Sequence, residues 1–345
     1  MRLGLMVGPE RRRYATKTAR MIEAAQQAEA GGFSSVWIPQ IPDEFDAMTA
    51  AALIGAATST VEVGTAVVVA QTRHPIALCQ QVLSVQLACE GRFALGLGPS
   101  HHWIIEDMLG LAYDRPAAQV RSYLDVLDQA LAGPGPIRVK NEHFAIDNPL
   151  DVTDQPATPV LLAALGPVML KLAGTRADGT VLWLADERAI GEYIVPRITA
   201  AATEAGRPPP RIVAGVPVCL CRSDEVDAAK ARAERLLAEA EVSPNYQRLL
   251  DRGDAAGVSD IMAVGPEDAV RARLRSFADA GVTDLSVRVL PVGDTREELI
   301  VSSARTREFL ASEISGPQPV VGQYPPAVPL RSGRLAPVRR RRGSG

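Results

Sequence analysis

The sequence predicts an α/β fold, a (β/α)8 TIM barrel with an insertion after the fourth βα unit and a disordered C-terminal tail. Short apolar runs alternate with helical stretches, and eight such runs can be counted along the 345 residues. This rhythm is typical of parallel βα units, and the length suits a single barrel. A hydrophobic content of 47% is enough to build a large core.

Each apolar run is expected to be a barrel strand. The third is rich in β-branched residues, which is typical of a strand buried on both faces. The strands are expected at Leu3–Val7, Ser35–Pro39, Val61–Val69, Phe93–Leu97, Val160–Ala164, Thr180–Leu184, Ile212–Leu220 and Asp284–Leu290.

The helices between the strands are recognised by their spacing and their ends. The first is rich in Ala and stops at Gly31-Gly32, as helices often do. The helices are expected at Thr16–Ala30, Asp46–Thr58, Pro75–Cys89, Pro116–Leu131, Met169–Ala173, Ile190–Ala205, Asp224–Ala240, Tyr246–Leu250, Ala269–Ala280 and Arg296–Leu310.

Two segments depart from this rhythm. Residues 133–159 contain five prolines and are expected to be a loop-rich insertion that shapes the pocket. Residues 314–345 contain six prolines, six arginines and no acidic residue, and they show no apolar period. We therefore expect a barrel domain over 1–313 and a disordered or surface-wrapping tail over 314–345.

Charge and hydropathy argue against several classes of protein. The net charge of −3 gives no whole-chain reason to expect a nucleic-acid partner. No run reaches the roughly 18 apolar residues of a membrane span, and the first strand is too short for a signal-peptide core. The four cysteines are expected to be reduced core residues, so a cytoplasmic location is expected. No metal site is expected, because the adjacent pair His101-His102 lacks partners at ligand spacing.

Active sites of such barrels collect at the C-terminal ends of the strands, so the residues that follow each strand are the candidates. There the sequence resembles the bacterial luciferase-like oxidoreductases, from about residue 1 to 310. Within that family it looks most like the branch that uses the deazaflavin coenzyme F420. The motifs that carry the resemblance are Gly64-Thr65-Ala66-Val67, Arg73-His74-Pro75, Gly96-Leu97-Gly98-Pro99-Ser100-His101, Ala163-Ala164-Leu165-Gly166-Pro167 and Leu172-Ala173-Gly174 followed by Ala177-Asp178-Gly179.

The resemblance implies a cofactor site. It places a bulge, often with a cis peptide before a residue other than proline, at Ala66-Val67 behind the isoalloxazine ring. It also places the cofactor's phosphate tail at Gly166-Pro167, where a helix N-terminus can hold an anion. The plainer interpretations are a regular third strand at Ala66-Val67, a tight turn at Gly96–His101 at the end of the fourth strand, and a well-started helix at Gly166-Pro167. The cofactor-binding residues expected from the resemblance are Gln40, Ala66, Val67, Gly98, Pro99, Ser100, Leu165, Gly166 and Pro167.

One motif is misleading and one is missing. Gly96-Leu97-Gly98 ends the fourth strand rather than the first, and it lacks the third glycine of a dinucleotide fingerprint, so a Rossmann site is rejected. Sugar-phosphate dehydrogenases of the deazaflavin branch carry an acid and then a histidine after the second strand. Gln40 and Ile41 stand there instead, which argues against alcohol oxidation by that route.

The leading hypothesis is an F420-dependent reductase or dehydrogenase acting on a C=C or C=N bond of a small molecule or modified peptide. The proton donor would be His101, His102 or Glu10. The alternatives are an FMN-dependent monooxygenase and a non-catalytic barrel that binds a ligand. The expected partners are the substrate and a second copy of the chain in a homodimer, with no nucleic acid and no membrane.

Overall fold

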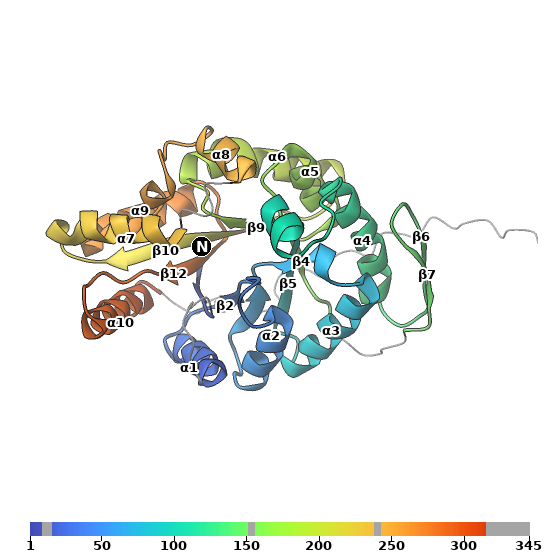
Figure 1. Ribbon diagram of the computed structural model, residues 1–345, viewed down its shortest axis with the longest axis horizontal. Coiled ribbons are helices and arrows are strands. Elements are labelled where there is room, and N and C mark those ends of the chain that lie inside the picture. Colours follow the sequence, from blue (N-terminus) through green and yellow to red (C-terminus); the bar gives the residue numbers. More distant parts are fainter. Residues whose placement is uncertain (9–15, 151–155, 238–242, 315–345) are drawn as a thin grey trace, which may run out of the picture.

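The fold is a closed barrel of eight parallel strands inside a ring of helices (Figure 1). The computed structural model describes residues 1–8, 16–150, 156–237 and 243–314. Strand β1 pairs with β2 and β12, and β10 closes the circle by pairing with both β9 and β12. The barrel strands are β1 (Arg2–Met6), β2 (Ser35–Ile38), β3 (Glu62–Thr65) continued by β4 (Val68–Val69), β5 (Phe93–Gly98), β8 (Val160–Ala163), β9 (Gly179–Trp183), β10 (Arg211–Leu220) and β12 (Asp284–Val289).

The helices confirm the predicted alternation. They pack around the strands over an extensive apolar layer that holds most of the core. The helices are α1 (Lys17–Ala30), α2 (Ala47–Ala56), α3 (Pro75–Ala88), α4 (Pro116–Leu131), α5 (Pro167–Arg176), α6 (Val195–Glu204), α7 (Val226–Leu237), α8 (Pro244–Leu250), α9 (Glu267–Asp279) and α10 (Arg296–Ser312). No described helix is both long enough and apolar enough to cross a membrane.

Local chemistry explains where several helices begin. Asp46 caps α2 by accepting from the Thr49 N–H at 2.9 Å. Thr295 and Glu298 form a reciprocal capping box at the start of α10. The Arg-His-Pro motif opens α3, where His74 Nδ1 accepts from the Ile76 N–H at 3.3 Å and a proline occupies the first turn.

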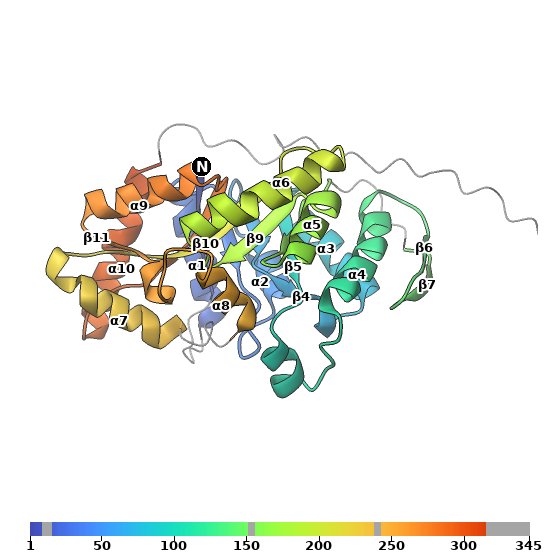
Figure 2. The same cartoon turned by 90° about the horizontal axis from the view of Figure 1, so that it is seen from above.

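The insertion after the fourth unit holds an antiparallel hairpin, β6 (Ile137–Lys140) and β7 (Ala145–Asn148). It lies at the outer edge of the molecule beside α4 (Figures 1 and 2), where the Gln129 side chain hydrogen-bonds both backbone groups of Arg138. No residue of this hairpin lines the large cavity described below. The expectation that this insertion shapes the pocket is therefore wrong for its described residues, 133–150 and 156–159, because α4 separates the hairpin from the strand ends.

Sequence reasoning also missed a short strand, β11 (Ala263–Gly265). It pairs in parallel with residues 218–220 of β10, beyond the segment 211–215 that pairs with β9. Three residues are too few to show a period in the sequence. The long β10 therefore pairs with β9 along its first half and with β11 near its end.

The middle of the barrel is filled by a small apolar cluster of its own. The indole of Trp37 is completely buried, and a methyl group at Gly64 would lie 2.4 Å from it. Gly64 is therefore the residue on β3 that leaves room for the largest side chain in the interior. The cluster consists of Trp37, Ala94, Leu161, Val181 and Val213, with Ala66 and Val67 packed against it.

The N-terminal end of the barrel is closed by four buried charges. Arg211 Nη2 lies 2.7 Å from Glu62 Oε1 and 2.7 Å from Asp284 Oδ1, and Arg2 Nη1 lies 3.1 Å from Asp284 Oδ1. Two arginines and two carboxylates balance, and they link β1, β3, β10 and β12. Burial acts to raise the pKa of Asp284, but the attraction of Arg211 and Arg2 outweighs it and lowers the pKa.

We predict that Asp284→Asn lowers the free energy of unfolding by about 3–5 kcal/mol near neutral pH, because it leaves a buried arginine charge uncompensated. Urea unfolding measures this loss. A lowered pKa contributes stability above the ordinary aspartate value of about 3.9 and loses it as the pH falls through the folded value, so the difference should shrink in acid.

The control for this variant is Asp147→Asn on the hairpin. Its ion pair with Arg138 is exposed, with 77% and 70% of the two side chains accessible, and should be worth less than about 1 kcal/mol. Equal effects of the two substitutions would show that the four buried charges do not hold the base of the barrel.

Candidate functional site

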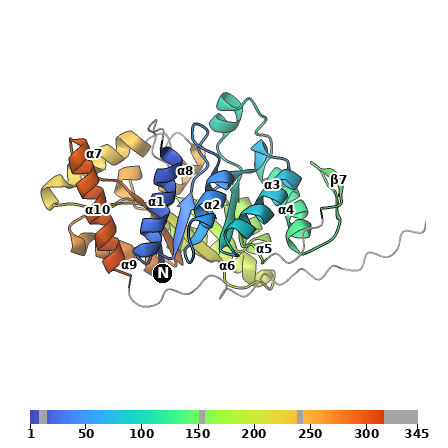
Figure 3. The same ribbon diagram turned by 90° about the horizontal axis from the view of Figure 1, so that it is seen from below.

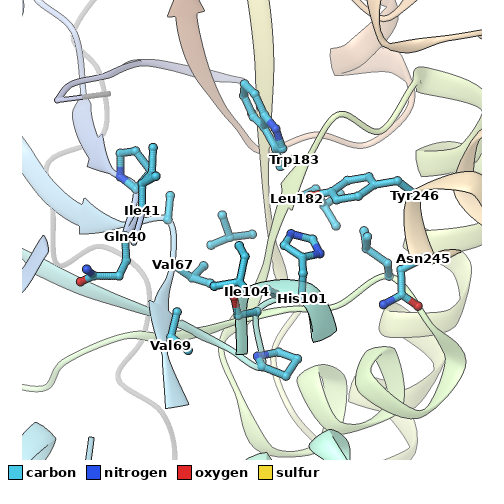
Figure 4. A pocket seen from close by; sticks show the side chains of 18 of the residues that line it. Gln40, Ile41, Val67, Val69, His101, Ile104, Leu182, Trp183, Asn245 and Tyr246 are labelled. Carbon is cyan, nitrogen blue, oxygen red and sulfur yellow. The ribbon is translucent and has the colours of Figure 1, made fainter. Parts of the chain in front are cut away.

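A cavity of about 600 Å³ opens at the C-terminal ends of the barrel strands (Figure 4). This volume is in the range of small-molecule sites. Figures 2 and 3 show this face, which carries α8 and the turn at 104–108, on the side opposite to the N-terminus. Every barrel strand contributes a lining residue, either from within the strand or from just beyond its end. These residues include Met6, Pro39, Ala66, Pro99, Ala163, Val181, Gly215 and Ser286.

The third strand carries the predicted bulge. Gly64 pairs with Ala94 and Val68 with Leu97, so four steps along β3 and β4 match three steps along β5. The peptide bond Ala66–Val67 is cis. Both residues line the cavity, so the bulge forms part of its wall.

Two glycines of β5 make room for the bulge. A methyl group at Gly98 would lie 2.9 Å from Val67 Cγ2 and 2.7 Å from Ala163 Cβ. At Gly96 it would lie 2.0 Å from the Thr65 carbonyl oxygen. The Thr65 hydroxyl accepts from the Gly96 N–H and donates to the Gly96 carbonyl, both at 2.9 Å. The Gly-Leu-Gly motif therefore accommodates the bulge, and Gly98 itself lies behind Val67 rather than on the cavity wall.

The two adjacent histidines are separated by the fold. His101 lines the cavity and is half-buried, whereas His102 is exposed and is not among the lining residues. His101 Nδ1 lies 3.3 Å from Ser243 Oγ, and its ring contacts those of Trp103 and Tyr246, the latter with centroids 5.5 Å apart. Figure 4 shows Tyr246 beside His101. Burial, together with the neighbouring His102, lowers the pKa of His101, so its ring is neutral at neutral pH.

Gln40 lines the cavity at its edge, but its carbonyl oxygen is used within the fold. Oε1 accepts from the Ala47 N–H at 3.0 Å and from Arg73 Nη2 at 3.4 Å, and Arg73 also pairs with Asp46. In Figure 4 the Gln40 side chain points away from His101. The arginine of the Arg-His-Pro motif thus fastens the loop after β2 to the start of α3.

The loop after β8 brings a helix N-terminus to the cavity. Leu165, Gly166 and Pro167 all line it, as do Pro99 and Ser100 after β5. No side chain caps α5, and the N–H groups of a first helical turn have no acceptor within the helix. A side chain at Gly166 would meet no atom within 4 Å. This end of α5 is therefore open to an anion.

The remaining candidate, Glu10, lies outside the described residues. Sequence reasoning missed Trp183, Ser286 and Arg288, which line the cavity from β9 and β12. They sit inside apolar strand patterns and gave no separate signal. Tyr246 and Asn245 also line the cavity, although they come from α8 and not from a strand end.

The chain matches the family described as luciferase-like monooxygenase over residues 1–284. It belongs to this family. The match covers all the barrel strands up to the start of β12, and with it the elements that build the cavity.

Individual relatives are similar over most of their length. The 5,10-methylenetetrahydromethanopterin reductase of Methanolobus tindarius is 26% identical over 304 residues, which is 80% of this chain and 91% of that protein. The F420-dependent hydroxymycolic acid dehydrogenase of Mycobacterium tuberculosis is 30% identical over 285 residues, covering 77% and 78%.

A solved structure confirms the fold. The oxygenating constituent of 3,6-diketocamphane monooxygenase from Pseudomonas putida, a type II Baeyer-Villiger monooxygenase in complex with FMN, superposes with a TM-score of 0.72. It is 19% identical and the superposition covers 91% of this chain and 97% of that one.

We predict that Gly98→Ala destabilises the protein by about 1–3 kcal/mol, because the added methyl overpacks the contact between Val67 and Ala163. Thermal unfolding measures the change. Gly166→Ala is the matched control, since its methyl enters open space, and it should stay within about 0.5 kcal/mol. If Gly98→Ala were as stable as Gly166→Ala, the bulge would not depend on this glycine.

Proposed function

We propose that this protein is a coenzyme F420-dependent reductase or dehydrogenase. The observation that carries the proposal is the cavity wall at Ala66–Val67, at the position where the family resemblance places the isoalloxazine ring. The two relatives named above support it, because their names describe a methanopterin reductase and an F420-dependent dehydrogenase.

The residues present fit a flat ring with an anionic tail. The walls are largely apolar. Gly215 lies across the barrel from the bulge, since β10 is four strands away from β3, and Trp183 lies beside it on β9. The open N-terminus of α5 would hold the phosphate. When bound, F420 supplies the hydride chemistry, and the barrel binds it, orients it and excludes water.

His101 is the proposed proton-handling group. Nδ1–H can donate to the Ser243 hydroxyl oxygen, which leaves the lone pair of Nε2 free to accept a proton. The lowered pKa keeps the ring from holding a charge at neutral pH. The proposed reaction is hydride transfer to or from a C=C or C=N bond of a small molecule or modified peptide. His101 Nε2 would accept the substrate's proton when hydride leaves, and the protonated ring would return it when hydride is added.

The second candidate function is an FMN-dependent monooxygenase. The description of the matching family and the fold of the FMN complex favour it. The two candidates differ in the ring that the cavity prefers, because oxygen chemistry needs a nitrogen at position five of the flavin.

We predict that F420 binds more tightly than FMN. The test is a fluorescence titration of the purified full chain with each cofactor at the same pH and salt concentration. Tighter binding of FMN would contradict the proposal and favour the monooxygenase.

Gly166→Asp tests the phosphate position. Its carboxylate would occupy the N-terminus of α5 and repel the cofactor tail, so F420 affinity should fall by about 1–3 kcal/mol, the scale of a charge-assisted contact. Gly166→Ala is the control and should bind like the wild type. Equal affinity of both variants would place the phosphate elsewhere.

A further inference from the structure

One wall of the cavity carries a polar pair that the cofactor proposal leaves unused. Ser286 and Arg288 lie two residues apart on β12, so their side chains share one face of the strand, and both line the cavity. Ser286 is 1% exposed. Among the described residues its Oγ has no hydrogen-bond partner. A buried hydroxyl without a partner is costly unless a ligand completes it.

The residues around Ser286 and Arg288 define the place where a ligand group would bind. Ser286 is paired on both sides with glycines, Gly4 of β1 and Gly215 of β10. The Trp183 ring packs against Gly215, where a methyl group would lie 2.5 Å from the indole. The Arg288 guanidinium lies 5.9 Å from the centre of the same ring. Trp183, Ser286 and Arg288 therefore form one cluster, which we call the β12 wall.

Charge is scarce around the rest of the cavity. Of its described lining residues, Asp43 is the one acidic side chain and Arg288 the one arginine or lysine. A guanidinium with a nearby hydroxyl suits a carboxylate, which accepts two parallel hydrogen bonds from arginine.

The mouth of the cavity is apolar and accessible. Met108, Val168 and Leu236 line it and are 52%, 65% and 39% exposed. They come from the turn after β5, the start of α5 and the end of α7, which are three separate segments around one opening. Exposed apolar side chains gathered at a site mark contact with an apolar ligand.

We propose that the substrate is a monocarboxylic acid with an apolar body, whose carboxylate binds Arg288 and Ser286 while its hydrocarbon part lies against Met108, Val168 and Leu236. This inference rests on the proposed function, because it names the substrate class of the same site. It assigns the β12 wall to the substrate and the α5 end to the cofactor.

The experiment is a binding titration of the full-length protein without cofactor, followed by tryptophan fluorescence, since Trp103 and Trp183 line the cavity. The probes are decanoate and 1-decanol, which share the alkyl chain and differ in charge. Decanoate should bind at least tenfold more tightly than 1-decanol. Equal affinity of the two probes would overturn the proposal.

Variants locate the carboxylate. Arg288→Met should remove the preference for decanoate and leave decanol binding within about twofold, whereas Arg288→Lys should keep part of it. Ser286→Ala should weaken decanoate binding alone. Arg138→Met, on the hairpin outside the cavity, is the matched control and should bind like the wild type.

A separate F420 titration distinguishes failure of this inference from failure of the proposed function. Arg288→Met should bind F420 like the wild type. A loss of F420 affinity with unchanged decanoate binding would assign Arg288 to the cofactor and overturn the inference alone. Displacement of decanoate by inorganic phosphate at comparable concentration would assign the β12 wall to a phosphate group and would also overturn it.

Discussion

Closing eight parallel strands into a barrel creates an interior that side chains must fill, and the rest of this structure depends on how that space is divided. Four balanced charges fill the N-terminal end, and the Trp37 cluster fills the middle. Charged and apolar side chains thus fill the barrel interior below the C-terminal ends of the strands. The C-terminal end is left open as a cavity bounded by every strand.

The bulge at Ala66–Val67 links this packed interior to the site. Val67 packs against the interior cluster from above and faces the cavity at the same time. Its position follows from Thr65, whose hydroxyl bonds both backbone groups of Gly96, and from the absence of a side chain at Gly98. The glycines of β5 therefore determine the shape of the cavity wall at Ala66–Val67, which belongs to the third strand.

The sequence was sufficient for the alternation of elements, because apolar runs are local. The bulge was expected from the family resemblance that the Gly-Thr and Gly-Leu-Gly motifs carry. The sequence was insufficient wherever the site depends on residues distant along the chain. His101 and His102 are indistinguishable in sequence, but Ser243 and Tyr246 from beyond β10 hold one of them in the cavity. Arg288 and Ser286 alternate with apolar residues on a strand whose inward face only the closed barrel defines. The hairpin at 137–148 was expected to line the cavity, but α4 lies between the hairpin and the strand ends.

The central claim is that the cavity holds a deazaflavin ring against Ala66–Val67 with its phosphate at the start of α5. A crystal structure of the full chain soaked with F420 tests it most directly. The account predicts the ring between Val67 and Trp183, and the phosphate within hydrogen-bond distance of the first N–H groups of α5. A ring bound elsewhere, or a phosphate held by Arg288 instead, would contradict it.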